Sequence, residues 1–274
     1  MCESKHRMHK LASFNGQIVD ASSPHIPALA SGAIYGQGIF TTIAVYERDP
    51  FLWDKHWGRI QGDGAKLGID LDEFPEPATR NALDDLIAAN SIQNGRARIT
   101  FFDESAPALW PYDAERGTNT LIMTADFRSS VENFRLTVSP HLINSTSPLA
   151  GIKSCNYLEK IIAKEEAKQS GFDEAIQLNE RGEISSACMA NVFWLKDGRL
   201  FTPSLKTGCL PGTTRAFVLE GIDCEEVEAR IEDLRDADEI FLTSAGIGVA
   251  QVAEFEERKL QRNQHAVMKL IPSR

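Results

Sequence analysis

Long apolar runs are missing from this 274-residue chain, and its first residues contain no apolar segment of signal-peptide type. No stretch approaches the roughly 20 apolar residues that cross a bilayer, so we expect neither a membrane partner nor export. Positive charge is also scarce, with 29 Lys and Arg against 39 Asp and Glu. Because nucleic-acid binding needs clustered basic side chains, the net charge of −10 predicts no nucleic-acid partner.

Recognisable metal-ligand patterns are absent as well. The five cysteines are scattered without C-x-x-C spacing, and the six histidines form no H-E-x-x-H set. We therefore expect no metal site, and reduced thiols in a cytoplasmic protein.

The chain has ordinary globular composition, with 42% hydrophobic and 25% charged residues. Predicted strands and helices alternate, and a polar segment, "RSSVEN", interrupts them at residues 128–133. The sequence thus predicts an α/β (α+β) fold of two lobes, with an N-terminal domain over 1–127, a linker over 128–133 and a C-terminal domain over 134–274.

Local signals place several elements. Residues 38–53 predict a strand, a polar turn and a second short strand. Asp54 is predicted to be the N-cap of the following helix, on which His56 and Arg59 share a face because they are three residues apart. Asp197-Gly198 predicts the tip of a hairpin.

Two features could carry chemistry together. Lys153 follows the apolar, glycine-containing stretch "LAGI" and precedes a predicted helix, although a solvated surface lysine is the ordinary alternative. In "LPGTTR" (210–215), a glycine and two threonines at a helix start can bind phosphate, although a well-capped helix is the ordinary alternative. A phosphate cradle and a desolvated lysine are what pyridoxal phosphate requires, since the lysine amine must react with its aldehyde.

The order of motifs resembles fold-type IV pyridoxal-phosphate enzymes, a group that includes branched-chain aminotransferases, D-amino-acid aminotransferases and aminodeoxychorismate lyases. The matching segments, over about residues 32–252, are "YGQGIFTTIAVY", "HWGRI", "LAGIKSCNYLEKIIAKEEA", "SSACMANVFWLKDGRLFTP", "CLPGTTR" and "DEIFLTSAG". The resemblance implies a two-lobed fold with pyridoxal 5′-phosphate between the lobes, and a homodimer that acts on a small amino substrate with a carboxylate.

The resemblance also implies roles for single residues. It makes Lys153 the Schiff-base lysine and Arg59 a ligand of the cofactor phosphate. The other implied cofactor contacts are Thr213 and Thr214 at the phosphate, Leu210 on the pyridine ring, the Ala245 backbone amide, and Ser186 and Asn191 of the "SSACMAN" motif. The implied substrate contacts are Phe40, Thr42, Arg96 and Arg98.

Within this group, "FTT" at 40–42 looks like the lyases, in which a threonine, here Thr42 or alternatively Thr41, faces the substrate. These lyases convert 4-amino-4-deoxychorismate to 4-aminobenzoate and pyruvate, a step toward folate. An aminotransferase acting on branched-chain or D-amino acids, and a relative without enzymatic activity, are the alternatives.

Two positions depart from the group's pattern. Ser186 stands where a glutamate usually holds the pyridine nitrogen protonated, and Glu183 is out of register. A neutral hydroxyl makes the ring a weaker electron sink, which should harm a transaminase more than a lyase. Asp103 stands where the lyases usually have an arginine, so Arg98 and Arg96, on one face of a predicted strand, become the candidate carboxylate ligands.

Overall fold

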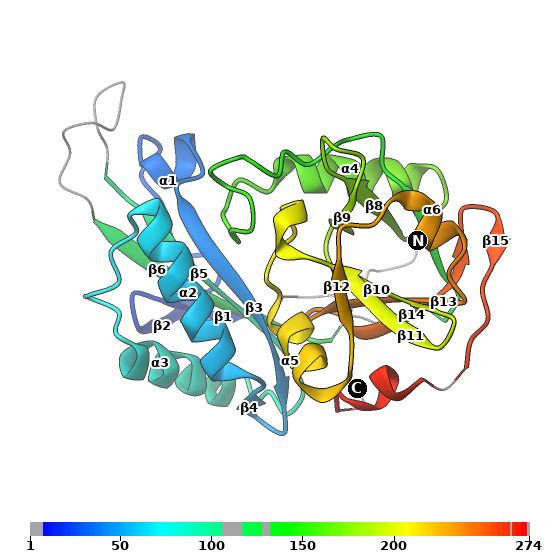
Figure 1. The fold of residues 1–274 in the computed structure, drawn as a ribbon. Coiled ribbons are helices and arrows are strands. Elements are labelled where there is room, and N and C mark those ends of the chain that lie inside the picture. Colours follow the sequence, from blue (N-terminus) through cyan, green and yellow to red (C-terminus); the bar gives the residue numbers. More distant parts are fainter. Residues whose placement is uncertain (1–7, 106–116, 128–131, 264, 273–274) are drawn as a thin grey trace. The chain divides into compact units, whose positions relative to one another are not determined.

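The computed structural model describes residues 8–105, 117–127, 132–263 and 265–272 and divides into two compact units (Figure 1). The first unit comprises the described residues up to Phe127 together with Lys153–Asn156, and the second comprises the remaining described residues. The domain boundaries expected from sequence place Lys153 in the C-terminal domain, whereas its contacts group it with the first unit. Most of the expected linker, 128–131, lies outside the described residues.

The first unit is built on an antiparallel sheet with the strand order β2-β1-β6-β5-β3-β4. Its strands are β1 (Leu11–Phe14), β2 (Gln17–Asp20), β3 (Gly38–Tyr46), β4 (Asp49–Pro50), β5 (Gly95–Asp103) and β6 (Thr118–Ala125). Its helices are α1 (Ser31–Ile34), α2 (Trp53–Leu67) and α3 (Glu76–Ala89).

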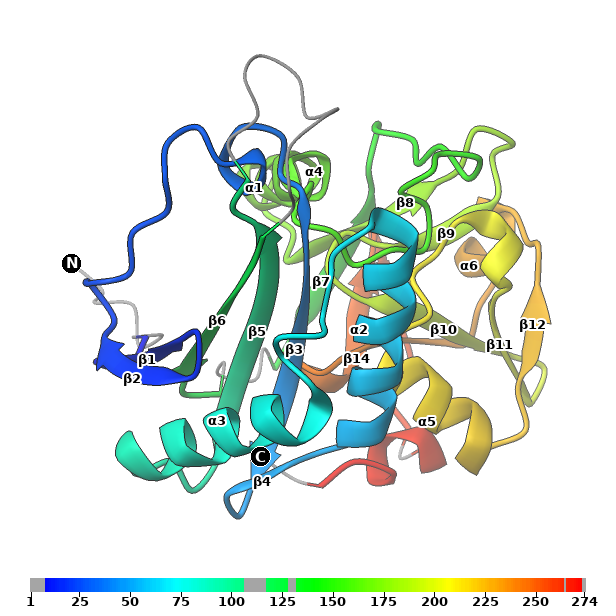
Figure 2. The ribbon, with the colours of Figure 1, turned by 90° about the vertical axis from the view of Figure 1, so that its left-hand side faces the viewer.

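The two faces of this sheet differ in what they carry. α2 packs along β3, and α3 packs on β1 and β6 (Figure 2). The face toward these helices carries Thr41 and, directly opposite it on β5, the fully buried Ile99. Because successive side chains of a strand point to opposite faces, Phe40 and Thr42 lie on the other face, which we call the Phe40 face.

The second unit contains a larger, mixed sheet with the order β12-β11-β10-β13-β14-β7-β8-β9, and β15 pairs with β14. Its strands are β7 (Phe134–Val138), β8 (Glu174–Leu178), β9 (Ile184–Ala187), β10 (Asn191–Lys196), β11 (Arg199–Pro203), β12 (Glu225–Val227), β13 (Glu239–Ser244), β14 (Gly248–Phe255) and β15 (Arg258–Lys259). Its helices are α4 (Leu158–Gln169), α5 (Thr213–Gly221) and α6 (Ile231–Arg235), with short 3-10 helices η1 (Leu205–Thr207) and η2 (Ala266–Lys269).

Local predictions and structure agree at the hairpin and differ at the start of α2. Asp197 and Gly198 both have positive φ angles, 50° and 76°, between β10 and β11, as the predicted hairpin requires. The prediction that Asp54 caps the helix was wrong. α2 begins at Trp53, its N-cap is Leu52 in the left-handed conformation, and Asp54 lies in the first turn. There its carboxylate still complements the helix dipole.

Both units therefore combine helices with sheets, which confirms the α+β class. Among the described residues, no helix has the length and apolar character needed to cross a membrane.

Candidate active site

Lys153 lies in a short extended segment that pairs with the edge of β3. The Phe40 N–H donates to the Lys153 carbonyl at 2.9 Å, and the Cys155 N–H donates to the Gly38 carbonyl at 2.8 Å. The Lys153 N–H donates to the Asp63 carboxylate at 3.1 Å. Both backbone polar groups of Lys153 are thus bound within the first unit, and its Nζ atom lies 4.3 Å from the centroid of the Phe40 ring.

The "GQG" sequence owes its glycines to this pairing. A Cβ on Gly38 would lie 2.7 Å from the Phe101 carbonyl oxygen and 3.1 Å from the Cys155 sulfur. Gly36 has a φ of +64° and receives a hydrogen bond from the Asn156 amide at its carbonyl. The glycines therefore let the Lys153 segment approach β3 closely, since any side chain at position 38 would hold it away.

The predicted substrate residues share the Phe40 face. Arg98 lies directly opposite Thr42 on the neighbouring strand, and Arg96 lies opposite Ala44. The Arg98 guanidinium carbon lies 3.7 Å from the Phe40 ring centroid, which is a cation–π contact, and its Nε donates to Thr100 at 3.2 Å. Two cationic side chains, Lys153 and Arg98, therefore contact one aromatic ring.

Arg59 and His56 lie on the other side of β3 and share one partner. Arg59 donates to the Thr41 hydroxyl at 2.7 Å, and His56 Nδ1 lies 2.6 Å from the same oxygen. Burial lowers the pKa of His56 well below 6.5, with the charges of Arg59 and Lys153 adding to the effect. His56 is thus a neutral hydrogen-bonding residue at neutral pH, and the fully buried Thr41 is committed to this network. Thr42 then lies on the Phe40 face, opposite Arg98.

The neutrality of His56 predicts a pH dependence of stability. In the unfolded chain the imidazole takes up a proton near pH 6.5, whereas the folded protein resists it, so the unfolded state binds more protons as the pH falls below 6.5. We expect the free energy of unfolding to fall with pH in this range, by up to about 1.4 kcal/mol per unit from this group. Urea denaturation of wild type and His56→Gln above and below pH 6.5 measures it.

His56→Gln should flatten this dependence, because glutamine does not titrate. His25→Gln, which removes an exposed imidazole from the same unit, is the matched control. An equally steep loss of stability in wild type and His56→Gln would contradict the assignment.

In the second unit, the start of α5 gathers several predicted cofactor residues. Thr213 and Thr214 open the helix, and both are buried. Gly212 is the N-cap, so the first turn receives no hydrogen bond from an N-cap side chain. Asn191 donates to the Leu210 carbonyl at 2.8 Å, which ties β10 to the segment before the helix.

Gly212 cannot be replaced without disturbing this arrangement. A Cβ at Gly212 would clash with the Asn191 side-chain oxygen. Thr243 on β13 lies directly opposite Asn191, so both side chains share one face of the sheet. The Thr243 hydroxyl is buried and has no hydrogen-bond partner within the part of the chain that the structure describes. An acceptor such as a phosphate oxygen would satisfy it.

Ser186 lies on β9 directly opposite Gln177 on β8, next to an irregularity in the strand register. Gln177 is buried and accepts a hydrogen bond from the Lys160 amine at 3.2 Å. Burial lowers the pKa of this amine. The cross-strand neighbour of Ser186 is thus a neutral amide backed by a lysine, and Glu183 is engaged elsewhere, with Arg181 and Asn179.

Comparison with known proteins identifies the family. The family model described as "Amino-transferase class IV" matches residues 38–255. The chain belongs to the class IV aminotransferase family.

Proteins with three different named activities are similar to the chain. It is 27% identical to an aminodeoxychorismate lyase of Bacillus subtilis, over 89% of this chain and 86% of that protein. It is 26% identical to a D-alanine aminotransferase of Bacillus licheniformis, over 89% and 87% of the two chains. The crystal structure of a branched-chain aminotransferase from Thermoproteus uzoniensis superposes with a TM-score of 0.88 and 25% identity, covering 96% and 92% of the chains.

Enzymes of class IV use pyridoxal 5′-phosphate, and the residues present fit this cofactor. Lys153 supplies an amine, and hydrogen bonds at its backbone N–H and carbonyl hold the residue in place. In the second unit, the buried threonines that open α5 and the Thr243 hydroxyl, which has no hydrogen-bond partner among the described residues, suit a bound phosphate group.

The surroundings of Asp103, Ala245 and two cysteines indicate what these residues do in the fold. Asp103 is buried and accepts the Ser105 N–H at 2.8 Å, so its carboxylate closes a turn. Ala245 lies in the turn between β13 and β14. Burial raises the pKa of the Cys155 thiol, and raises that of Cys188 to about 12 with Glu174 adding to the effect. Neither thiol is a nucleophile at neutral pH.

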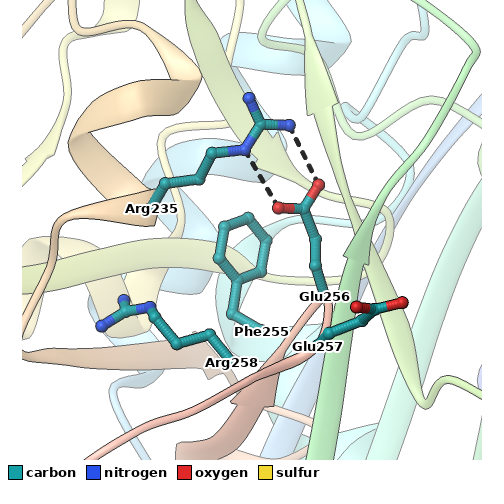
Figure 3. Close-up of a pocket in the computed structure, with 5 residues that line it drawn as sticks. All are labelled: Arg235, Phe255, Glu256, Glu257 and Arg258. Carbon is teal, nitrogen blue, oxygen red and sulfur yellow. Dashed lines mark hydrogen bonds and ion pairs between the residues drawn. The ribbon is translucent and has the colours of Figure 1, made fainter.

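The arginines that line a pocket in the second unit are bound to other groups of the protein. It is lined by Arg235, Phe255, Glu256, Glu257 and Arg258 (Figure 3). Arg235 makes two hydrogen bonds of 3.0 Å to Glu256, and Arg258 donates to the carbonyls of Leu234 and Ala237 at the end of α6. These cations are already bound by protein groups, and no residue that the sequence singled out lies there.

Four neighbours of the predicted residues were not predicted from the sequence. Asp63 lies four residues after Arg59, so helical spacing alone could have placed it on the same face of α2. Thr243 stands directly before the "SAG" loop, and no local sequence pattern indicates that its hydroxyl lacks a partner in the described part of the chain. Gln177 and Lys160 meet near Ser186 through strand pairing and helix packing, which sequence spacing does not reveal.

Proposed function

We propose that the chain is a pyridoxal-phosphate-dependent lyase that converts 4-amino-4-deoxychorismate to 4-aminobenzoate and pyruvate. The observation that carries the proposal is the set of hydrogen-bonding groups next to Ser186. Its hydroxyl, the Gln177 amide and the Lys160 amine offer hydrogen-bond donors, whereas Glu183 is bound to Arg181 and Asn179. Donors favour an unprotonated pyridine nitrogen, since only that form accepts a hydrogen bond.

An unprotonated ring is a weak electron sink, and the two candidate reactions differ in their need for one. Transamination must store a full carbanion before the proton is returned, so it depends strongly on the sink. In the lyase reaction, the electrons of the broken ring C–H bond form an aromatic double bond as the C–O bond to enolpyruvate breaks. Because the substrate ring becomes aromatic, the reaction depends less on a positive charge at the pyridine nitrogen of the cofactor. An unprotonated pyridine nitrogen therefore favours elimination over transamination.

We assign cofactor-binding roles to the residues that the resemblance indicates. Arg59, Thr213, Thr214 and the Ala245 amide would bind the phosphate, Leu210 would pack on the pyridine ring, Asn191 would hold the segment before α5, and Lys153 would carry the cofactor. When bound, pyridoxal phosphate supplies an aldehyde for an amine and a ring that withdraws electrons. The Thr41 hydroxyl orients Arg59, because it accepts the Arg59 N–H at 2.7 Å.

Lys153 would move the protons of the reaction at its Nζ atom. It would remove the proton from the substrate ring carbon that bears the amine, and return a proton to the methylene carbon of the leaving enolpyruvate to give pyruvate. Thr42, across the strand pair from Arg98, would orient the substrate.

The substrate carboxylates would bind to arginines of the Phe40 face. The lyase substrate carries two carboxylates, and Arg98 and Arg96 are two guanidinium groups on the same face of β5. The contact with Phe40 and the hydrogen bond to Thr100 hold Arg98 in one orientation, which lowers the entropy lost on binding.

An aminotransferase acting on branched-chain or D-amino acids is the second candidate. Arg98 against Phe40 would also suit a single amino-acid carboxylate, and class IV relatives of similar identity are named as aminotransferases. We propose further that the enzyme works in the cytoplasm as a homodimer, on the strength of its resemblance to fold-type IV enzymes.

The test supplies aminodeoxychorismate to the purified, cofactor-loaded chain and follows 4-aminobenzoate by its fluorescence. We expect stoichiometric 4-aminobenzoate and pyruvate. In a parallel measurement, single amino acids are added without an acceptor. A lyase leaves the absorption of bound pyridoxal phosphate unchanged, whereas a transaminase converts it to pyridoxamine phosphate. Absence of 4-aminobenzoate together with that conversion would replace the proposal by the second candidate.

A further inference from the structure

Asp63 is a buried carboxylate beside Lys153 that the proposed reaction does not use. Its side chain is 4% exposed and lies on α2, one turn after Arg59. Its Oδ2 atom accepts the Lys153 N–H at 3.1 Å, across 90 positions of the chain. A buried carboxylate is costly unless nearby donors and cations compensate it, so its presence at this lysine calls for a reason.

The charges around Lys153 suggest that reason. Arg98 contacts the same aromatic ring as the Lys153 amine, and Arg59 lies on the adjacent helix α2. Both guanidinium groups disfavour a proton on Lys153 Nζ, and partial burial acts in the same direction. Two further groups on nearby elements supply no negative charge: His56 is neutral, and the Cys155 thiol has a raised pKa.

Asp63 is the group in this set that can carry a negative charge. Burial is the largest effect and leaves the pKa of Asp63 raised above 3.8, while the Lys153 N–H and the charges of Arg59, Lys66 and Lys153 act to lower it. These cations favour the ionised form of Asp63, and its negative charge offsets their mutual repulsion. The interaction is reciprocal, because a carboxylate stabilised by Lys153 must in turn stabilise a proton on the Lys153 amine.

We propose that Asp63 is a positioning residue for Lys153, which it serves in two ways. Its hydrogen bond holds the backbone of the Lys153 segment against the first unit, and its charge lets Nζ hold a proton among neighbouring arginines. The inference rests on the role of Lys153 in the proposed function, where Nζ must accept a proton and later release it. It holds equally for lyase and aminotransferase chemistry.

Two substitutions separate the two effects. Asp63→Asn keeps an oxygen that can accept the Lys153 N–H and removes the charge, whereas Asp63→Ala removes both. In Asp63→Asn we expect the pH midpoint of the bound cofactor's absorption spectrum to fall by about one unit, because an opposite charge nearby shifts a pKa by that order. Asp63→Ala should show the same fall and also bind less cofactor.

A second measurement reads the Lys153 amine without cofactor. The full-length chain, freed of cofactor, is labelled with acetic anhydride over a range of pH, and mass spectrometry follows acetylation at Lys153. The midpoint for Lys153 should again be about one unit lower in Asp63→Asn than in wild type. Asp54→Asn is the matched control, since Asp54 is an exposed aspartate on the same helix, and its midpoint should equal that of wild type.

The outcomes are distinguishable from failure of the proposed function. Midpoints in Asp63→Asn equal to those of wild type, or an equal shift in Asp54→Asn, would overturn the role of the Asp63 charge. Borohydride reduction followed by peptide mapping identifies the lysine that holds the cofactor. If that lysine is not Lys153, the proposed function fails at its cofactor site, while the labelling of Lys153 still reports the charge of Asp63.

Discussion

Replacing Lys153 by alanine is expected to lower the rate of 4-aminobenzoate formation by at least about a thousandfold. The substitution removes both the amine that holds the cofactor and the group that moves the reaction's protons. The backbone of residue 153 should stay in place, because its N–H and carbonyl keep their hydrogen bonds with the Asp63 carboxylate and the Phe40 N–H when the side chain is removed. The measurement is the turnover rate at saturating cofactor, with circular dichroism to show that the variant is folded.

Two further variants test whether the effect is specific to the Lys153 amine. Lys153→Arg keeps a positive charge against Phe40 but provides no reactive amine, so it should be as inactive as the alanine variant. Lys168→Ala removes an exposed lysine from the last turn of α4 and should retain wild-type activity. Substantial activity in Lys153→Arg would show that Lys153 contributes charge alone, and would contradict its assignment as the catalytic amine.

Replacing Gly212 by alanine is expected to damage both stability and cofactor binding. The added Cβ would clash with the Asn191 side-chain oxygen, so Asn191 or the start of α5 must move. Overpacking of this kind costs about 1–3 kcal/mol of unfolding free energy. Movement of the helix start should also weaken pyridoxal-phosphate binding about tenfold or more, since one lost hydrogen bond to a charged group is worth at least that.

Urea denaturation and absorbance titration with pyridoxal phosphate measure the two effects. Gly62→Ala is the matched control, because a Cβ there meets no atom within 4 Å and Gly62 lies inside α2. That variant should be more stable than wild type by about 0.5–1 kcal/mol, as alanine is the better helix former. Wild-type cofactor affinity in Gly212→Ala would show that the phosphate does not bind at the start of α5.

The local sequence singles out Lys153 as a candidate and gives no such signal for Asp63. Lys153 stands in a local pattern, an apolar stretch before a helix, that neighbouring residues define. Asp63 gains its importance only from its contact with the Lys153 N–H, 90 positions away along the chain. Within α2, "GDG" reads as a weak, polar part of a helix. Spacing from Arg59 predicts its face of the helix, but no local pattern predicts what that face meets.

Whether Thr41 or Thr42 lies on the Phe40 face also depends partly on the sequence and partly on the tertiary structure. The sequence predicts a strand there, and strand periodicity alone places the two side chains on opposite faces. Which face receives a helix is a tertiary matter, decided when His56 and Arg59 of α2 bind the Thr41 hydroxyl. Thr42 is thereby left on the face that carries Phe40 and Arg98.

By itself the sequence determined the α+β class, the hairpin at Asp197-Gly198 and the helix after Gly212, and it singled out Lys153 as the candidate lysine of a pyridoxal-phosphate enzyme. These depend on residue periodicity and on turn and cap preferences, which act over a few residues. The tertiary structure alone decided that Lys153–Asn156 joins the first unit and that Ser186 has a neutral amide as its cross-strand neighbour. Strand pairing and helix packing bring together residues far apart in the chain, and their energies depend on partners that no local pattern specifies.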